Sequence, residues 1–278
     1  MEIFDQFMAL VDRDLVVDVN RLNAELRLEK ESMLVDNVLP HTFVGNLDKM
    51  VENDCILIIG INPFLWEDAR FEKANVELPF RCLGNYRRTG NPDALSDWFR
   101  FQNRYFLSDE MNETHFKKIA NLVGPRYFPS TYGGNNWKQT LFQHIVEVDI
   151  VPYYSTKARI NDRKLADLYR DDPALIANLN LIKSIIKKIR PKWIQVNGKA
   201  GWATISQELL EDGGTIIDDA QDKGSEIMVG HAKLAISRVP VLMHKFIGGI
   251  GGANSHVQRN QVMDSWDKWL EGEALCPH

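Results

Sequence analysis

The stretch Cys55-Ile-Leu-Ile-Ile-Gly-Ile-Asn-Pro-Phe64 decides the fold class of this chain. Its apolar residues run without a polar interruption into Gly60, and an apolar run this short, bounded by Gly and Pro, predicts a strand buried on both faces. Pro63 has no N–H and cannot continue a sheet ladder, so we expect the strand to stop there. Asn62 would then lie at the carboxyl end of a central strand, where open α/β sheets bind ligands. The plainer interpretation is a strand-to-loop turn, because Asn-Pro is a common turn starter.

Three further apolar segments predict the other central strands, at residues 145–151, 193–196 and 239–243. Helical spacing between them is clearest over residues 173–190, where leucines and isoleucines, Ile176 among them, share one face. Strands that alternate with helices in this way predict an α/β fold with a mainly parallel central sheet flanked by helices.

The rest of the chain adds smaller elements to this alternation. Residues 2 to about 31 predict one or two helices that precede the sheet and pack on it. The stretch from Leu65 to about Asn136 is rich in aromatic and loop-forming residues, and 215–237 predicts two or three short strands. A final helix is expected from about Asn254. No repeat or linker divides the chain, so we expect a single domain over 1–278, with 1–52 as an N-terminal helical extension.

Composition indicates a soluble globular protein of 278 residues, with 44% hydrophobic and 26% charged residues. No apolar run approaches the roughly 20 residues that a membrane span needs, and the acidic N-terminus does not resemble a signal peptide. The three cysteines are far apart and form neither a disulfide framework nor a CxxC metal motif. These features predict a cytoplasmic protein with no membrane partner.

The formal net charge of −5 does not by itself indicate nucleic-acid binding. Arginines are nevertheless concentrated between residues 81 and 104, and lysines between 183 and 192. Either segment could form a phosphate-facing patch on an acidic protein. For the second segment a solvated helix face is the better interpretation, because isoleucines occupy the opposite stripe.

Three of the predicted strands end on polar residues, namely Asn62, Asp149 and His244. If these strands are parallel neighbours, the three side chains converge on one crevice, with Phe80 available as an aromatic wall. An Asn, an Asp and a His beside an aromatic ring suit a planar polar ligand, whose ring stacks while its edges meet donors and acceptors.

The order and spacing of these segments resemble the uracil-DNA glycosylase superfamily. Gly60-Ile-Asn-Pro63 is similar to the first family motif in its asparagine form, as in the mismatch-specific and single-strand-selective branches. Pro79-Phe80 resembles the segment that stacks on the flipped base, and Val148-Asp149-Ile150 the strand end that reads it. Trp193–Ala200 and Val241–His244 resemble the later strand elements, the second leading to the catalytic histidine. The resemblance covers roughly residues 53–271 and implies a three-layer α/β/α fold.

Three positions depart from the family pattern. The last motif usually reads His-Pro-Ser, whereas here His244-Lys-Phe is followed by a longer glycine-rich loop. Asp149 stands where many members have Asn, and an ionised Asp accepts from the N3–H of uracil but cannot donate to O4. Phe64 follows the proline where asparagine-type members commonly have Gly, and an aromatic ring there could close the pocket against a C5-methyl group.

The resemblance implies a monofunctional DNA glycosylase, a hydrolase of base-excision repair that binds damaged DNA, flips a base, with uracil expected, and hydrolyses its N-glycosidic bond. His244 would donate to uracil O2 as negative charge builds there, and Asn62 would position the attacking water. Gly60, Ile61, Phe64, Phe80 and Asp149 would bind the base. The loop would enter the minor groove, with Ile247 or Ile250 as an apolar wedge. Its other expected DNA contacts are Gly248, Gly249, Gly251, Gly252 and Ser255. No cofactor or metal is expected, because three scattered cysteines cannot ligate an iron–sulfur cluster.

Each candidate residue also has a purely structural interpretation. Asn62 could cap a turn, His244 could be a core histidine with its hydrogen bonds satisfied, and Phe80 could be core. Asp149 could cap a helix or form a buried ion pair, and the glycine-rich loop could hold a nucleotide phosphate. The alternative function is a non-catalytic or repurposed superfamily member that binds a nucleobase, nucleotide or protein. A phosphate-transferring enzyme is a weaker hypothesis, because the chain lacks a GxxxxGK[ST] motif.

Overall fold

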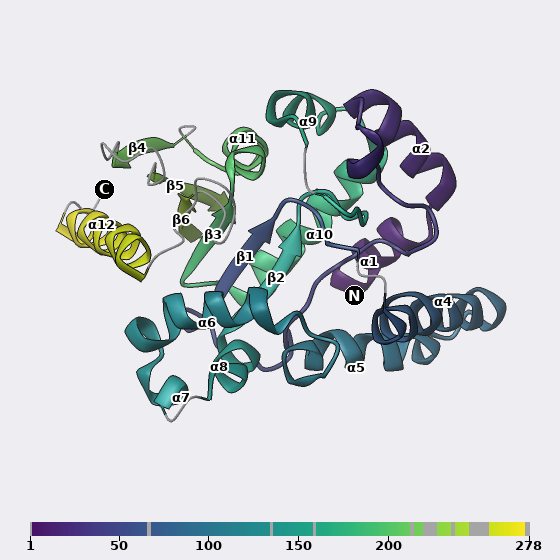
Figure 1. Cartoon of the computed structure of the whole chain (residues 1–278), viewed down its shortest axis with the longest axis horizontal. Coiled ribbons are helices and arrows are strands. Elements are labelled where there is room, and N and C mark those ends of the chain that lie inside the picture. Colours follow the sequence, from purple (N-terminus) through teal and green to yellow (C-terminus); the bar gives the residue numbers. More distant parts are fainter. Residues whose placement is uncertain are drawn as a thin grey trace.

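The computed structural model describes residues 2–65, 68–133, 136–157, 160–211, 214–218, 227–234, 237–244 and 256–275. A six-stranded, mostly parallel sheet lies between two layers of helices, so the protein has the three-layer α/β/α fold that the sequence predicts (Figure 1). Among the described residues, no helix combines the length and apolar character needed to cross a bilayer.

The sheet has the strand order β2-β1-β3-β6-β5-β4. The first four strands are parallel neighbours, which confirms the predicted central sheet, and β5 and β4 extend it in antiparallel fashion. Along the chain the strands are β1 (Ile56–Gly60), β2 (Ile145–Asp149), β3 (Trp193–Asn197), β4 (Thr215–Asp218), β5 (Ile227–Leu234) and β6 (Ser237–His244). Beyond β2, the amides of Ile150 and Val151 still donate to the carbonyls of Gly60 and Ile61, so the chain follows β1 past both strand ends.

The larger apolar core lies on one face of the sheet, under α10 (Pro173–Ile189) and α1 (Glu2–Val11). Five more helices contribute to this core: α2 (Leu15–Leu26), α4 (Leu78–Thr89), α5 (Ser96–Arg104), α9 (Asp162–Leu168) and α11 (Lys199–Glu208). The prediction for 173–190 is confirmed, except that Ile176 is 36% exposed and does not belong to the buried stripe. The N-terminal helix α1 packs on α10 and belongs to the same apolar core as β1.

The second apolar core lies on the opposite face, beneath α6 (Glu113–Tyr127), α8 (Trp137–His144) and α12 (His256–Leu275). Figure 1 shows α6 and α8, with the short α7 (Pro129–Tyr132), below the sheet and α12 beside β4–β6. Val262 and Trp266 of α12 are buried in this core.

The stretch from residue 68 to 133 is mostly helical, although its prolines and glycines suggested loops. Pro79 and Pro92 lie in the first turns of helices, where a missing N–H costs nothing. The elements before α6, apart from α5, are α3 (Ala69–Phe71), η2 (Glu72–Glu77), α4 (Leu78–Thr89), η3 (Pro92–Leu95) and η4 (Tyr105–Leu107). A short turn, η1 (Lys30–Ser32), follows α2.

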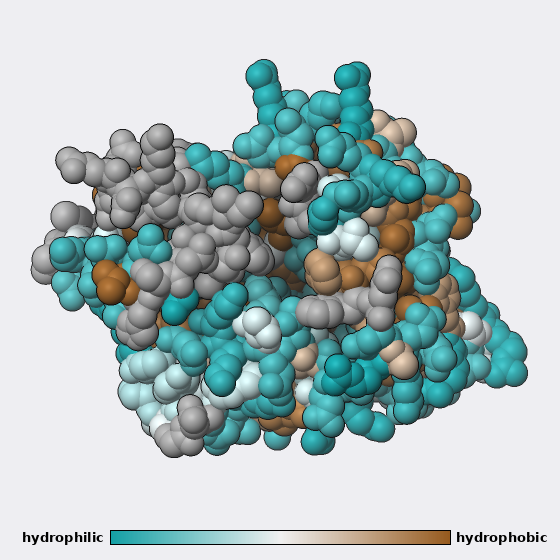
Figure 2. Space-filling view, in the orientation of Figure 1, coloured by the Kyte–Doolittle hydropathy of each residue, from teal (hydrophilic) through white to brown (hydrophobic). Residues whose placement is uncertain are grey.

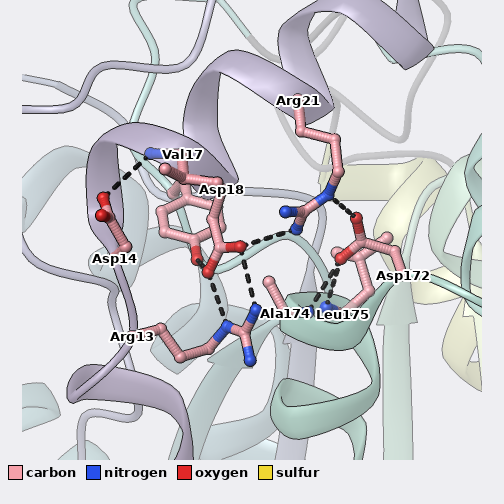
Figure 3. A network of polar contacts seen from close by, with 9 residues as sticks. Arg13, Asp14, Val17, Asp18, Arg21, Asp172, Ala174 and Leu175 are labelled. Carbon is pink, nitrogen blue, oxygen red and sulfur yellow. Dashed lines mark hydrogen bonds and ion pairs between the residues drawn. The ribbon is translucent and has the colours of Figure 1, made fainter.

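A polar network around Asp18 fastens α2 to the start of α10 (Figure 3). The Asp18 carboxylate accepts from Arg13 Nε at 2.5 Å, from Arg21 Nη2 at 2.7 Å and from the Tyr153 hydroxyl at 3.3 Å. Arg21 Nε also donates to Asp172 at 2.8 Å, and Asp172 caps α10 by accepting from two backbone amides. Burial alone would raise the pKa of Asp18, but the hydrogen bonds from Arg13 and Arg21 outweigh it and hold that pKa below its ordinary value.

The outer edge of β2 is covered by the segment around Val44. Val44 and Glu147 exchange both backbone hydrogen bonds, at 2.9 and 2.8 Å, and the His41 amide donates to the Pro152 carbonyl. Gly45 has a φ of +123° and lies so close to β2 that an added Cβ would meet the Ile145 carbonyl oxygen at 2.5 Å. The segment therefore needs glycine at this position to lie against the strand.

Candidate functional site

Alternation along the parallel strands gives the sheet one apolar face and one face with polar side chains. On the α10 side, every strand residue between the ends of β1, β2, β3 and β6 is apolar. On the other side the carboxyl ends carry Asp149, Gly60, Asn197 and His244, one from each strand in the order β2-β1-β3-β6. Asp149 pairs with Gly60, and Asn197 pairs with His244. The three side chains are buried, with exposures of 6%, 2% and 2% for Asp149, Asn197 and His244.

Gly60 leaves a gap in this row that the β2 carboxylates occupy in part. A Cβ added at Gly60 would lie 2.1 Å from Asp149 Oδ1 and 3.7 Å from Glu147 Oε1. Both carboxylates therefore approach the same point above β1. A side chain larger than hydrogen at position 60 would displace Asp149, so Gly60 contributes to the site through its missing Cβ.

Each of these carboxylates faces a histidine from another part of the chain. His41 Nδ1 lies 3.1 Å from Asp149 Oδ2, and His115 Nε2, in α6, lies 3.6 Å from Glu147 Oε1. Tyr105 is packed near the same two carboxylates, and burial raises the pKa of its phenol, which keeps it protonated. The structure thus assembles an acid–histidine cluster at the β2 end of the row.

Asn62 has a side-chain amide whose orientation is fixed by its neighbours. Nδ2 donates to Ser155 Oγ at 2.8 Å, to the Pro63 carbonyl at 3.3 Å and to the Tyr153 carbonyl at 3.4 Å. Backbone carbonyls only accept, and the Ser155 hydroxyl donates to the Lys157 carbonyl, so the nitrogen must face all three. Asn62 Oδ1 is buried and finds no hydrogen-bond partner in the described part of the chain. The loop after β2 therefore holds Asn62 with a spare acceptor.

This arrangement gives a physical reason for Asn rather than Asp at position 62. An ionised Asp there would set a negative oxygen against two carbonyl oxygens and Ser155 Oγ, with no proton to share. Asn supplies a donor to these groups and keeps one oxygen for a ligand or a water. Ser155 also joins the two strand-end loops, because its amide donates to the Pro63 carbonyl and its carbonyl accepts from Leu65.

The structure brings some of the predicted residues together and separates others. Asn62, Gly60 and Asp149 lie on the adjacent ends of β1 and β2, and His244 ends β6, two strands from β1. Ile61 is half-buried and lies next to Gly198, whose added Cβ would lie 3.4 Å from the Ile61 side chain. Phe64 is 50% exposed beyond the strand, and Phe80 is 40% exposed on α4, outside the buried row. Figure 2 shows hydrophobic side chains near the middle of one molecular face, between the positions of α9 and α5 in Figure 1.

The predicted DNA-binding loop, from Ile247 to Ser255, lies outside the described residues. The described residues also contain no group of three or more His, Cys, Asp or Glu side chains placed to hold a metal ion.

The sequence analysis missed several residues of the site, among them Glu147, His41, His115, Gln195 and Asn197. Glu147 had a usable signal, because it lies two residues before Asp149 on a predicted strand and so shares its face. Gln195 has the same relation to Asn197 on β3. The sequence held no such signal for His41 and His115, because only the packing of the segment around Val44 and of α6 brings them to β2.

The comparisons with known proteins identify no relative. No protein-family model, no curated protein and no solved structure matches this chain.

Proposed function

We propose that this protein is a DNA glycosylase that hydrolyses the N-glycosidic bond of a flipped, damaged base, with uracil as the first candidate, and that it serves base-excision repair in the cytoplasm. The observation that carries the proposal is Asn62, whose amide nitrogen is held by three acceptors while its buried Oδ1 has no partner among the described residues. A fixed, unused acceptor at the carboxyl end of a central parallel strand is suited to orienting an attacking water.

The proposed reaction uses water and needs no redox step. Asn62 Oδ1 accepts a hydrogen bond from the water, whose oxygen attacks C1′ of the sugar as the N-glycosidic bond breaks. The bonding electrons leave with the base, and His244 donates a hydrogen bond to the base oxygen on which negative charge builds. The proton released by the water neutralises the negative charge of the departed base. Asn62 is neutral and a poor base, so most of the acceleration must come from stabilisation of the leaving base and from positioning.

The remaining candidate residues would recognise the base. Asp149 would accept from an N–H on the edge of the base, Gly60 would leave room for the Asp149 carboxylate that binds it, and Phe64 or Phe80 would supply an aromatic face. The predicted loop, including Ile247 and Ile250, would fill the space that the flipped base leaves in the duplex.

The test is a single-turnover cleavage assay, at enzyme excess, on single- and double-stranded DNA that contains one uracil. Wild type is compared with Asn62→Ala, His244→Ala and Ser155→Ala. We expect cleavage by wild type and its loss in the first two variants. Ser155→Ala keeps Oδ1 but removes one anchor of Nδ2, so we expect an intermediate rate. Circular dichroism and a urea midpoint for each variant separate lost chemistry from lost folding.

Two outcomes would contradict parts of the proposal. Cleavage that survives both Asn62→Ala and His244→Ala would leave a glycosylase with another active site. Absence of cleavage of every base tested would favour the non-catalytic nucleobase-binding alternative. Salt dependence then separates the two functions, because DNA binding weakens steeply as salt rises and binding of a free nucleobase barely changes.

A further inference from the structure

Several buried groups around Gly60 offer hydrogen-bond acceptors. On the β2 side, Asp149 Oδ1 and Glu147 Oε1 both lie within 4 Å of the point where a Cβ of residue 60 would be. Asp149 and Glu147 are buried, with exposures of 6% and 8%. As carboxylates they accept hydrogen bonds and donate none.

Gln195 on β3 adds a second, independent sign of an unfilled site. It is fully buried, and its Nε2 donates to Asn197 Oδ1 at 3.3 Å, so the side chain extends toward the residue that lies beside Gly60 on β3. Its Oε1 is buried and has no hydrogen-bond partner among the residues that the structure describes. A buried carbonyl oxygen without a donor is costly to the fold, which indicates that a ligand or water supplies the donor.

Several protein donors also lie near this site: His115 Nε2 is 3.6 Å from Glu147 Oε1, and the Tyr105 phenol packs near both carboxylates. His41 faces the other oxygen of Asp149, Oδ2, and Tyr154 donates its hydroxyl to Asn75 Oδ1 at 3.4 Å. The Asn62 amide nitrogen faces its three acceptors on the strand-end loops. Asn62 Oδ1 and Gln195 Oε1 have no hydrogen-bond partner among the described residues, and Asp149 Oδ1 and Glu147 Oε1 can each accept a further hydrogen bond, so these strand ends suit a partner that is rich in N–H groups.

The pattern of donors on a base decides which base fits such a site. The recognition edge of uracil presents acceptor, donor, acceptor, so two of its three groups would face protein acceptors. A 2-amino-6-oxopurine presents N1–H and both protons of its 2-amino group along one side, and one carboxylate can accept from N1–H and N2–H together. The second amino proton remains for a neighbouring acceptor such as Glu147.

We propose that the site takes a guanine-type base, a damaged 2-amino-6-oxopurine, in preference to uracil. This inference rests on the proposed glycosylase function and names its substrate class. Asp149 accepts from N1–H and N2–H, and Glu147 accepts from the second N2 proton. Hypoxanthine keeps N1–H but lacks the 2-amino group, so it leaves Glu147 and one hydrogen bond to Asp149 without a donor and is disfavoured, as is uracil.

The experiment compares four duplexes in the single-turnover assay, each with one 7-methylguanine, 8-oxoguanine, hypoxanthine or uracil. In parallel, the affinities of the whole protein for guanosine and inosine are measured by calorimetry. We expect at least one guanine-type lesion to be cleaved about tenfold or more faster than uracil, and guanosine to bind about tenfold or more tighter than inosine, since a hydrogen bond to a charged group is worth that factor.

Variants test whether the Glu147 carboxylate is responsible for the preference for guanosine over inosine. Glu147→Gln replaces an oxygen with a donor and is expected to reduce the guanosine-to-inosine ratio toward one. Glu113→Gln is the matched control, because Glu113 lies on α6 with a 59% exposed side chain paired with Lys138. It is expected to leave the ratio unchanged.

The possible failures are distinguishable. Faster cleavage of uracil than of any guanine-type base would overturn this inference and leave the glycosylase proposal intact. If no duplex is cleaved, the glycosylase proposal fails, and the guanosine-to-inosine ratio still decides the ligand class. Equal binding of guanosine and inosine, or a ratio that Glu147→Gln does not move, would overturn the inference.

Discussion

Two polar clusters lie on opposite faces of the same sheet, and they differ in how well their hydrogen bonds are satisfied. On the α10 side, Asp18 accepts from two arginines and a tyrosine, and Arg21 in turn reaches Asp172 (Figure 3). On the other side, Asp149 and Glu147 crowd the space above Gly60, and Gln195 keeps an oxygen without a donor among the described residues. The first cluster is explained by folding alone, whereas the second holds polar atoms that have no partner among the described residues.

The difference in satisfied hydrogen bonds separates a structural cluster from a candidate functional one. Buried polar groups cost stability unless they are paired, so a paired cluster is consistent with a structural role. Buried polar atoms without a partner in the described structure, at the carboxyl ends of parallel strands, indicate that a ligand completes the set. The two clusters are connected, because the Tyr153 hydroxyl donates to Asp18 while its carbonyl accepts from Asn62. The four substitutions and conditions below test the contrast.

Asp18→Ala should have the largest effect on stability. It leaves Arg13 and Arg21 without their shared carboxylate and removes the acceptor of the Tyr153 hydroxyl. Because both arginines are partly exposed, we expect a loss of about 3 kcal/mol, at the low end for breaking a buried ion pair. Asp12→Ala is the control, since Asp12 and Arg87 form an exposed pair worth less than about 1 kcal/mol. Urea unfolding measures both, and equal losses would refute the assigned structural role.

Gly60→Ala should have the next largest effect and should act on the unsatisfied cluster. The new Cβ would lie 2.1 Å from Asp149 Oδ1, so the carboxylate must move. Overpacking of this kind costs about 1–2 kcal/mol, and the displaced Asp149 should lose its ligand. Gly84→Ala is the matched control, because a Cβ there meets nothing within 4 Å on helix α4, and it should be neutral or slightly stabilising. A Gly60→Ala protein with unchanged ligand affinity would contradict the placement of the site.

Acid pH should weaken the paired cluster. The pKa of Asp18 is lower in the folded protein than its ordinary value of 3.8, so its contribution is complete above that value and is lost as pH falls through the folded pKa. One proton changes the unfolding free energy by at most about 1.4 kcal/mol per pH unit. We therefore expect the stability difference between wild type and Asp18→Asn to shrink as pH is lowered below about 4. A difference that stays constant down to about pH 2.5 would argue against this ionisation.

Gln195→Leu should have the smallest effect, and its sign should be opposite. The substitution removes a buried oxygen that has no donor in the described structure, at the cost of one 3.3 Å hydrogen bond to Asn197. We expect stability to rise by up to about 1 kcal/mol while ligand affinity falls. Thermal unfolding with and without guanosine measures both effects. A clear loss of stability would show that Gln195 is satisfied by the fold itself.

The sheet could be predicted from the sequence because its central strands are uninterrupted apolar runs that stop at proline or polar residues. The helices between residues 68 and 133 were obscured, since Pro79 and Pro92 suggest loops until their place in first helical turns is known. For the site, the ends of the predicted strands were enough to single out Asn62, Asp149 and His244 as candidates. The histidine partners of the carboxylates depend on tertiary packing. His41 comes from the segment that covers the outer edge of β2, and His115 comes from α6.

The thiol of Cys55, the residue just before β1, can report on opening of the central sheet. The side chain is fully buried, its Sγ donates to the Ile189 carbonyl at 3.6 Å, and burial raises the pKa of the thiol to about 12. A thiol-labelling reagent reacts with the thiolate and needs access, so it can modify Cys55 only after α10 separates from β1. In a Cys276→Ser chain, the labelling rates of Cys55 and of Cys82 on α4 would compare opening of the central sheet with local opening of α4. A ligand bound above Gly60 should slow the first rate far more than the second.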